Sequence, residues 1–454
     1  MTVFIPIFRR SEARIVFLTD IWKTLLCEES ARIVLIVPSF MAAELESAAL
    51  GERVTVEPIN TQPPARRSFF DAFFYRLSLF YADTPLSREE RRAHILLEWK
   101  RPVRYALSLA LLFVFGRAHL LRRALRFLDL LFVRDRSFDS LFARHHPDVV
   151  FIPGTTHSSG HALLREAKRR GIRSVVLAAS APEEIAASRL PLRITPSCML
   201  VENDLFKQEA TFLFDMPKEN VLAVGNPLFD RYRESPVLSR NDFCSRFHID
   251  PSHRIILFAS AGNLHLDERL VLKDIDNAIE QCALPSDLSI LVRHYPEKNM
   301  YIGDSEYSDR VAFDNSGILF AKDKTYLAVL ADEMATFTDS FVYADVVIST
   351  AGKLLQTAAV FQNPIINLAY DHSRVPPHQS VSRYYTEHYP AYRHAQKCGA
   401  AVLARAKSEL VDLINEALTN PLQWKSGQAC VVKKLSPYSN GEAGKRVGRA
   451  VCAV

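Results

Sequence analysis

Small polar residues follow two buried, strand-like segments in the C-terminal half of the chain. Ser260 ends the first segment and Gly262 lies just beyond it, whereas Ser349, Thr350 and Gly352 stand at the end of the second. Residues of this kind contribute little to a hydrophobic core, but they let an anion approach the N–H groups at a helix start. The pattern therefore indicates a phosphate-binding edge of a sheet.

Charged and amide side chains lie close to the same strand ends. Arg293 and His294 follow a third apolar segment, Lys353 begins a helical pattern, and Gln356 comes one helical turn later. Neither GxxxxGK[ST] nor GxGxxG is present, so the two common nucleotide fingerprints are excluded. Each loop alone also fits an ordinary turn. Three such loops at matching strand ends favour a site for a base, a ribose and a diphosphate, because ligands bind at the carboxyl ends of strands in α/β sheets.

The N-terminal half offers two candidates for acid–base chemistry. Glu12 follows the strand-like segment 2–8 and has the carboxylate best placed to deprotonate an acceptor hydroxyl, although it equally fits a charge at a helix N-terminus. His157 lies in "GTTHSSGH" after the segment 148–154 and suits a general base or an acceptor contact, but a structural loop histidine also fits. Both readings stay open for each residue.

Several functions are excluded by composition and missing motifs. The seven cysteines have no CxxC pair, which argues against a zinc site and a disulfide framework and favours a reducing compartment. HExxH and GxSxG are absent, so no metal is expected and a hydrolase elbow is excluded. The net charge of +5 does not indicate a nucleic-acid binder. The N-terminus lacks the order of a secretory signal, so a cytoplasmic location is expected.

The region 101–126 combines an apolar run with arginines. Its longest uncharged stretch, 105–115, is shorter than the roughly 20 residues of a spanning helix. Arginines flank that stretch and few acids lie nearby, which suits a helix on the anionic inner surface of a membrane. The alternative is a buried helix with arginines at its ends.

The whole chain alternates strand-like and helical patterns, which predicts an α/β fold. We expect two Rossmann-like domains facing each other across a cleft, with a hinge near Gly225. The predicted parts are an acceptor domain at 1–224 with a helical insertion at about 66–145, a nucleotide-donor domain at 225–425, and a helical tail at 426–454. The 11–28 segment is predicted as one helix.

Four segments resemble GT-B transferases, especially relatives of the CDP-glycerol glycerophosphotransferases and of the UDP-N-acetylglucosamine 2-epimerase superfamily. They are "VLAVGNPLFDRY" (221–232), "LVRHYP" (291–296), "YADVVISTAGKLLQTAAVFQNPIINLAYD" (343–371) and "SELVDLINEALTNP" (408–421). The resemblance covers most of 148–420.

This resemblance implies roles for the residues at the strand ends. His294 would lie near the diphosphate or leaving group, and Ser349, Thr350 and Gly352 would donate hydrogen bonds to phosphates. Gln356 stands where many relatives carry a ribose-binding Glu, and Lys353 replaces their usual Ser or Thr.

The expected function is a metal-independent transferase in surface glycan biosynthesis, with a nucleotide-sugar or CDP-glycerol donor as substrate and no separate cofactor. Its acceptor would be a glycan or a lipid-linked molecule. Two alternatives stay open. One is a nucleotide-sugar 2-epimerase or hydrolase, which is disfavoured by the few acidic residues seen near the donor loops. The other is a non-catalytic sugar-binding scaffold, which the residues at 353 and 356 would permit.

Overall fold

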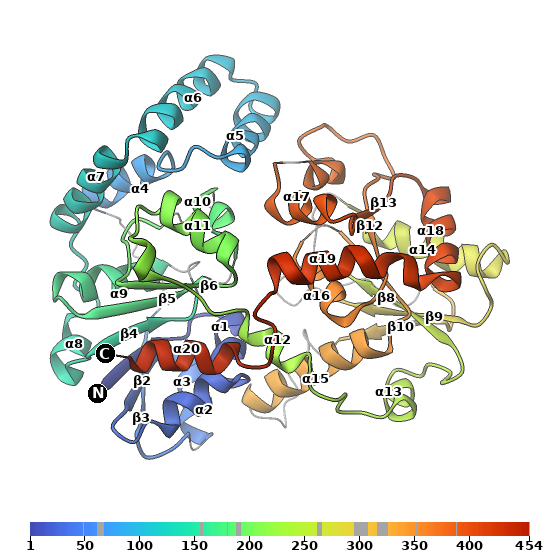
Figure 1. Ribbon diagram of the computed structural model, residues 1–454, viewed down its shortest axis with the longest axis horizontal. Coiled ribbons are helices and arrows are strands. Elements are labelled where there is room, and N and C mark those ends of the chain that lie inside the picture. Colours follow the sequence, from blue (N-terminus) through green and yellow to red (C-terminus); the bar gives the residue numbers. More distant parts are fainter. Residues whose placement is uncertain are drawn as a thin grey trace. The chain divides into compact units, whose positions relative to one another are not determined.

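A computed structural model describes residues 1–48, 50–60, 68–154, 158–178, 180–187, 192–260, 266–294, 307–315, 326–350, 352–386 and 388–453. The chain divides into two compact units (Figure 1). Unit 1 comprises Met1–Arg231, Thr325–Leu327 and Pro437–Val454, and unit 2 comprises Tyr232–Lys324 and Ala328–Ser436. Each unit is considered by itself.

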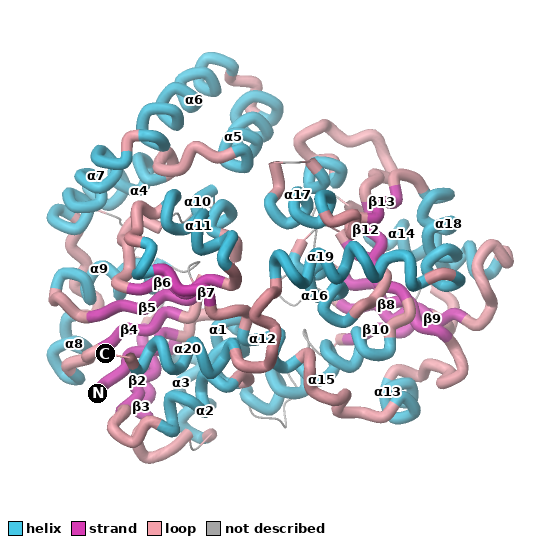
Figure 2. Tube along the Cα trace, viewed as in Figure 1, coloured by secondary structure: helices cyan, strands magenta, loops and turns pink. Residues whose placement is uncertain are grey.

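Within its described residues, unit 1 has a parallel seven-stranded sheet in the order β3-β2-β1-β4-β5-β6-β7 (Figure 2). Its strands are β1 (Thr2–Pro6), β2 (Arg32–Pro38), β3 (Val54–Ile59), β4 (Val149–Ile152), β5 (Arg173–Leu177), β6 (Cys198–Val201) and β7 (Val221–Ala223). The central strands are runs of Val, Ile, Leu and Phe buried on both faces, as parallel sheets require.

The helices of unit 1 fall into a Rossmann-like set and an insertion. The first set is α1 (Arg10–Phe17), α2 (Asp20–Cys27), α3 (Ser39–Ser47), α8 (Asp139–His145), α9 (Ser158–Arg169), α10 (Pro182–Ala187), α11 (Asp204–Leu213), η2 (Lys218–Asn220), α12 (Pro227–Arg231) and α20 (Ala443–Cys452). The insertion is α4 (Phe69–Ser78), α5 (Pro85–Arg91), η1 (Arg92–Glu98), α6 (Pro102–Arg117) and α7 (His119–Phe132). The prediction of one helix over 11–28 is wrong, because the Thr19 side chain accepts a hydrogen bond from Ile21 N and starts α2 as a separate helix.

Unit 2 contains, among its described residues, a parallel six-stranded sheet in the order β10-β9-β8-β11-β12-β13. Its strands are β8 (Arg254–Ala259), β9 (Leu288–Arg293), β10 (Val311–Asp314), β11 (Val346–Ser349), β12 (Ile365–Leu368) and β13 (Val402–Ala404). Its helices are α13 (Arg240–Arg246), α14 (Glu268–Glu280), α15 (Tyr326–Tyr343), α16 (Lys353–Phe361), η3 (Val381–Tyr385), α17 (Pro390–Lys397), α18 (Lys407–Thr419), η4 (Pro421–Trp424) and α19 (Lys425–Leu435). Two parallel sheets with crossover helices confirm the predicted α/β class.

The C-terminal segment after 425 is shared between the units. Helix α19 belongs to unit 2, whereas α20 returns to unit 1 and packs on α2. A Cβ on Gly444 would lie 2.9 Å from the backbone N of Asp20, so only glycine permits this close approach. Gly225, where we expected a hinge, lies inside unit 1 beside Tyr438 with a φ of +91°. The chain passes between the units after Arg231, on either side of Thr325–Leu327, and after Ser436.

One pair of cysteines is joined in the structure. Cys398, just after α17, and Cys430, on α19, form a disulfide with their Cα atoms 5.5 Å apart. The cysteine pattern did not predict this bridge, although one bridge is not the disulfide framework that the pattern argued against. The two residues are 32 positions apart and lie on separate helices, so their spacing in the sequence gave no sign of the pairing.

The insertion is attached to unit 1 by charges buried beneath α7. Arg122 and Arg126 both contact the carboxylate of Asp215, at 2.5 Å each. One turn further, Asp129 contacts Arg165 at 3.1 Å and Arg193 at 2.6 Å. These side chains are almost fully buried. Burial opposes ionisation of Asp215, but the hydrogen bond from Arg122 and the charge of Arg126 outweigh it, so the pKa of Asp215 lies below its ordinary value.

The alternative in which α6 is a buried helix is wrong. Its only buried residues are Ser108, Leu112 and Gly116, which form one narrow stripe. Among the described helices, none alone has the length and apolar composition to cross a membrane. Taken together, α6 and α7 have that length and composition, but they bend by 91° between them.

We expect Asp215→Asn to lower the free energy of unfolding by about 3 kcal/mol, because it leaves two buried arginines without a countercharge. Urea denaturation at neutral pH measures this change. Since the folded-state pKa of Asp215 lies below the ordinary 3.8, its contribution is present above that pH and lost as pH falls through the folded value. The difference in the free energy of unfolding between wild type and variant should therefore shrink at acidic pH. Glu52→Gln, at an exposed carboxylate of the same unit, is the control, and equal losses from both substitutions would contradict the role of Asp215.

Candidate functional site

The carboxyl edge of the six-stranded sheet brings together residues from three loops. Ala259 pairs with Arg293, so one residue further along Ser260 is level with His294. Phe258 pairs with Ile348, so two residues further along Ser260 is also level with Thr350. The backbone N of Ser260 still donates to Arg293 O at 3.0 Å, so the ladder extends to this row. Neighbouring strands are about 4.8 Å apart, which places His294 and Thr350 on either side of Ser260.

This row lies where the strand order reverses. Strands β9 and β10 extend from β8 to one side of the sheet, and β11, β12 and β13 extend to the other. The crossovers leave β8 and β11 in opposite directions at such a point, which opens a crevice at their carboxyl ends. Ser260 follows β8 and Thr350 follows β11, so both stand at this point.

The hydroxyls of Ser260, in this row, and of Ser349, just before Thr350, donate hydrogen bonds to other residues of unit 2. Ser349 Oγ donates to Ala259 O at 2.6 Å and ties β11 to β8. Ser260 Oγ donates to Glu268 Oε2, at the first residue of α14. The two hydroxyls thus hold the loop bases in place. The Ser349 hydroxyl is thus engaged and Ser349 is paired with Asn367 in the sheet, so the donation to a phosphate implied for Ser349 by the resemblance stays a prediction.

Arg293 is buried in an ion pair. Its guanidinium donates to Asp314 at the end of β10, lies 3.9 Å from Glu333 Oε1, and stacks over the Phe337 ring with Cζ 5.0 Å from the centroid. Two carboxylates already compensate its charge. The expectation that Arg293 offers a cation to a diphosphate is therefore replaced by a role in fixing β9, β10 and α15.

His294 follows Arg293 and is also buried. Its ring stacks on Phe313 of β10, with centroids 5.9 Å apart and planes at 14°. The stacking orients the imidazole at the row shared with Ser260 and Thr350. Because the group is removed from water, its hydrogen bonds to a charged ligand would be strengthened.

Helix α16 begins directly beyond Thr350 and Ser349. Gly352 precedes its first residue with a φ of +153°, a conformation that side chains with a Cβ rarely adopt. A Cβ built at Gly352 would meet no described atom within 4 Å, so the described residues leave room at this helix start. Lys353 follows as an exposed cation. The N-terminus of α16 thus combines backbone donors, a positive dipole end and room.

Gln356 faces α19 rather than the helix start. Its Nε2 donates to Leu435 O at 3.1 Å and to Ser436 Oγ at 2.7 Å, at the end of α19. Both amide hydrogens therefore serve the C-terminus of that helix. A Gln at this position has a structural reason, because a carboxylate could not donate these bonds.

The remaining candidates belong to unit 1 or lie outside the described residues. Gly262 and His157 are not among the residues described. Glu12 is buried at the start of α1, where its Oε2 accepts from Phe8 N at 2.7 Å and Arg9 N at 3.1 Å. It therefore caps the helix, and its other oxygen would lie 3.1 Å from a Cβ on Gly154 at the end of β4.

Sequence reasoning missed three carboxylates at the edge of the six-stranded sheet. Asp314 and Glu333 lie against Arg293, and Glu268 accepts from Ser260. In contrast, Asp345 accepts from Ile255 N at the opposite edge. The register of β10 with β9 reveals Asp314, but this pairing is not readable from the linear sequence. Contrary to the expectation from the sequence, acidic side chains are therefore present at this edge.

We expect Gln356→Glu to destabilise unit 2 by about 2 kcal/mol, because it removes the donor to Leu435 O and places negative charge at a helix C-terminus. Thermal or urea unfolding measures the change. Gln423→Glu, on an exposed residue beside the same helix, is the matched control. If Gln356→Glu left the stability of unit 2 unchanged and tightened nucleotide binding, the side chain would face the ligand instead.

No family model and no curated protein matches the chain. Solved structures do. The UDP-GlcNAc 2-epimerase from Neisseria meningitidis bound to UDP-GlcNAc is 12% identical, with a TM-score of 0.57 and 100% of each chain covered. The UDP-GlcNAc 2-epimerase from Methanocaldococcus jannaschii is 14% identical, with a TM-score of 0.54 and 100% of each chain covered. A variant of the wall teichoic acid polymerase TagF is 10% identical, with a TM-score of 0.50, covering 100% of this chain and 88% of TagF. The chain has the GT-B fold that these enzymes share.

Proposed function

We propose that the chain binds a nucleotide-activated donor at the carboxyl edge of the six-stranded sheet and transfers its sugar or glycerol-phosphate group to a hydroxyl. One observation carries the proposal: the register aligns His294, Ser260 and Thr350 at the reversal of strand order, beside the open N-terminus of α16. That arrangement suits a diphosphate, whose charge the helix start would stabilise.

The chain's own groups suffice for such a transfer without a bound metal. The acceptor oxygen forms a bond to the anomeric carbon or the phosphorus of the donor, the bond to the leaving phosphate breaks, and a base takes the hydroxyl proton. His294, Lys353 and the α16 start would stabilise the leaving phosphate. His157 and Glu12 are the proposed bases. The carboxylate of Glu12 also accepts hydrogen bonds from backbone N–H groups at the start of α1.

A nucleotide-sugar 2-epimerase is the second candidate. The observation that favours it is the set of carboxylates at the same edge, Asp314, Glu333 and Glu268. An epimerase or hydrolase changes the donor alone, whereas a transferase consumes it only when an acceptor is present. Incubating the protein with UDP-GlcNAc or CDP-glycerol, with and without a glycan or lipid-linked acceptor, separates the two candidates. Turnover without any acceptor would overturn the transferase proposal.

The cellular setting proposed for this activity is surface glycan assembly on the cytoplasmic side. A scaffold with no activity would give no turnover in either incubation and no stabilisation by any nucleotide. Such a result would remove the enzyme proposal altogether.

Binding itself is tested by thermal shift with UDP, CDP, GDP and their sugar or glycerol conjugates. A ligand that binds the native state raises stability by RT ln(1 + [L]/Kd), so one nucleotide family should raise the unfolding temperature. Gly352→Val should abolish that shift because its side chain fills the space at the α16 start. Gly441→Val is the matched control, since Gly441 also has a positive φ and open space around it. A shift retained by Gly352→Val would place the nucleotide elsewhere.

A further inference from the structure

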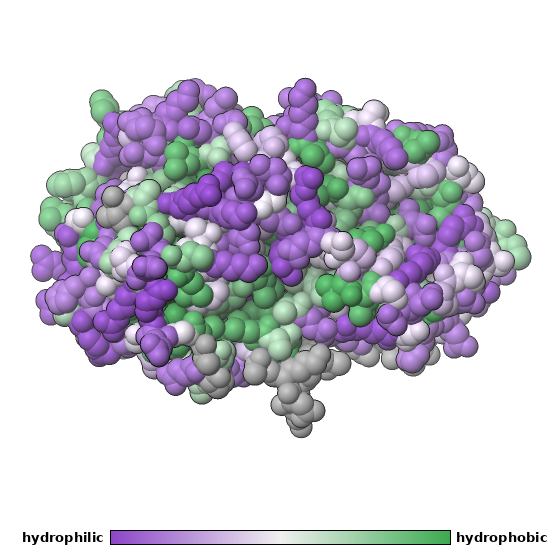
Figure 3. Space-filling model, turned by 60° about the horizontal axis from the view of Figure 1, so that its bottom comes forward, coloured by the Kyte–Doolittle hydropathy of each residue, from purple (hydrophilic) through white to green (hydrophobic). Residues whose placement is uncertain are grey.

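Helix α7 of unit 1 is amphipathic, but its charged face is buried and its apolar face is exposed. Its buried residues are Arg122, Arg126 and Asp129, at four- and three-residue spacing. Its outward residues, here named the α7 face, are Leu120 (81% exposed), Leu121, Phe127 (65%), Leu128, Leu131 (52%) and Phe132. Single exposed apolar residues are normal on proteins, and Figure 3 shows several among hydrophilic neighbours. A whole helix face of them is not normal.

The neighbouring helices extend this apolar surface. Phe70 of α4 stacks on Phe132 with ring centroids 5.2 Å apart, and Phe73 on the same helix is also exposed. On α6, Val103, Leu107 and Val114 are more than half exposed and fall on one helical stripe. The fold supports this exposure, since Asp215 holds Arg122 and Arg126 of α7 inside. Asp129, also on α7, pairs inside with Arg165 and Arg193.

Cations accompany the exposed apolar side chains. Between Lys100 and Phe132 the only carboxylate is the buried Asp129, whereas arginines are frequent. Exposed Arg104 lies over Trp99, and exposed Arg117 lies over Phe113 at 4.3 Å. The surface thus pairs large apolar groups with exposed arginines, of which Arg117 also contacts Asp83 at 3.5 Å. That combination complements a lipid bilayer with anionic headgroups.

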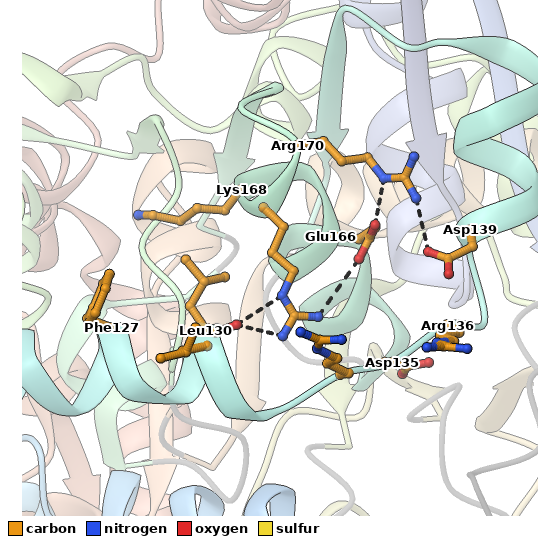
Figure 4. Close-up of a pocket in the computed structure, with 11 residues that line it drawn as sticks. Phe127, Leu130, Asp135, Arg136, Asp139, Glu166, Lys168 and Arg170 are labelled. Atoms are coloured by element: carbon orange, nitrogen blue, oxygen red, sulfur yellow. Dashed lines mark hydrogen bonds and ion pairs between the residues drawn. The ribbon is translucent and has the colours of Figure 1, made fainter.

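A cavity of about 580 Å³ adjoins the C-terminal end of the α7 face. Phe127 and Leu131 line it from α7, and Lys168, Arg169 and Arg170 line it from the end of α9 (Figure 4). Arg170 contacts Glu166 and Asp139 there. Arg134 and Arg136 also line it, and their guanidinium groups make no hydrogen bond or ion pair with the described parts of the chain. The cavity therefore joins apolar walls to two available cations.

We propose that the α7 face lies on an anionic phospholipid surface, with its leucines and phenylalanines in the interface and a headgroup phosphate beside Arg134 and Arg136. The 91° bend between α6 and α7 suits helices that lie in the interface. A second copy of the chain fits less well, because a two-fold interface would bring the cationic surroundings of this face together. This inference stands independently of the proposed nucleotide site.

Sedimentation of the full chain with vesicles tests the proposal. Binding to vesicles of phosphatidylglycerol and phosphatidylcholine should exceed binding to phosphatidylcholine alone and should weaken with salt. The double variant Phe127→Ser, Leu131→Ser should lose on the order of tenfold or more in vesicle affinity. Phe40→Ser, Leu422→Ser, at two exposed apolar residues elsewhere, should bind as wild type does.

The charged part of the surface has its own test. Replacing Arg134 and Arg136 with Gln should weaken binding to the anionic vesicles roughly fivefold for each charge removed. Arg374→Gln, at an exposed arginine of unit 2, is the control. Unchanged unfolding temperatures will show that each variant is folded. Two results would overturn the proposal: wild-type protein that stays in the supernatant with anionic vesicles, or a soluble dimer that Phe127→Ser, Leu131→Ser dissociates, which would make a second copy the occupant.

Discussion

Polar groups at the carboxyl ends of the unit 2 strands must find partners inside the protein, because the strands are covered on both faces. The structure meets this constraint in several ways. Arg293 pairs with Asp314, Ser349 donates to Ala259 O, and Ser260 donates to Glu268. Asn367, at the corresponding level of β12, donates to Val402 O. These bonds fix the strand ends and so define the floor on which a ligand would rest.

The same constraint separates supporting residues from candidate binding residues. The polar side-chain atoms of Arg293, Ser349 and Gln356 form hydrogen bonds within unit 2. The row of His294, Ser260 and Thr350 and the start of α16 lie one step further along the chain, at the edge itself. A charged substrate there would meet groups that are already oriented, which lowers the reorganisation needed for catalysis.

Unit 1 meets the constraint with charges rather than with neutral hydrogen bonds. Asp215 and Asp129 retain arginines beneath α7 and thereby turn the leucines of that helix outward. A buried ion pair is seldom the most stabilising choice for a core. Here it has a structural consequence that an apolar core could not provide: it presents an apolar helix face away from the body of unit 1.

The fold was readable from the sequence, because continuous Val, Ile and Leu runs alternate with helical patterns along the chain. The candidate strand ends followed from the same alternation. The reversal of α7 was not readable, since an amphipathic pattern has two faces and does not say which is inside. Its decisive partner, Asp215, lies 93 positions from Arg122. Gln356 likewise meets Ser436 at a separation of 80, and the return of α20 to unit 1 depends on contacts just as distant.

Hydrogen exchange with and without the nucleotide that stabilises the protein tests the central claim most directly. Amides that donate to a phosphate, or that are covered by it, exchange more slowly in the complex. The account predicts slower exchange in peptides spanning Ser349–Gln356 and the carboxyl ends of β8 and β9. Exchange should change little in β13, the strand at the edge of the sheet. Protection confined to unit 1, or no protection at the start of α16, would contradict the assignment of the donor site to this edge.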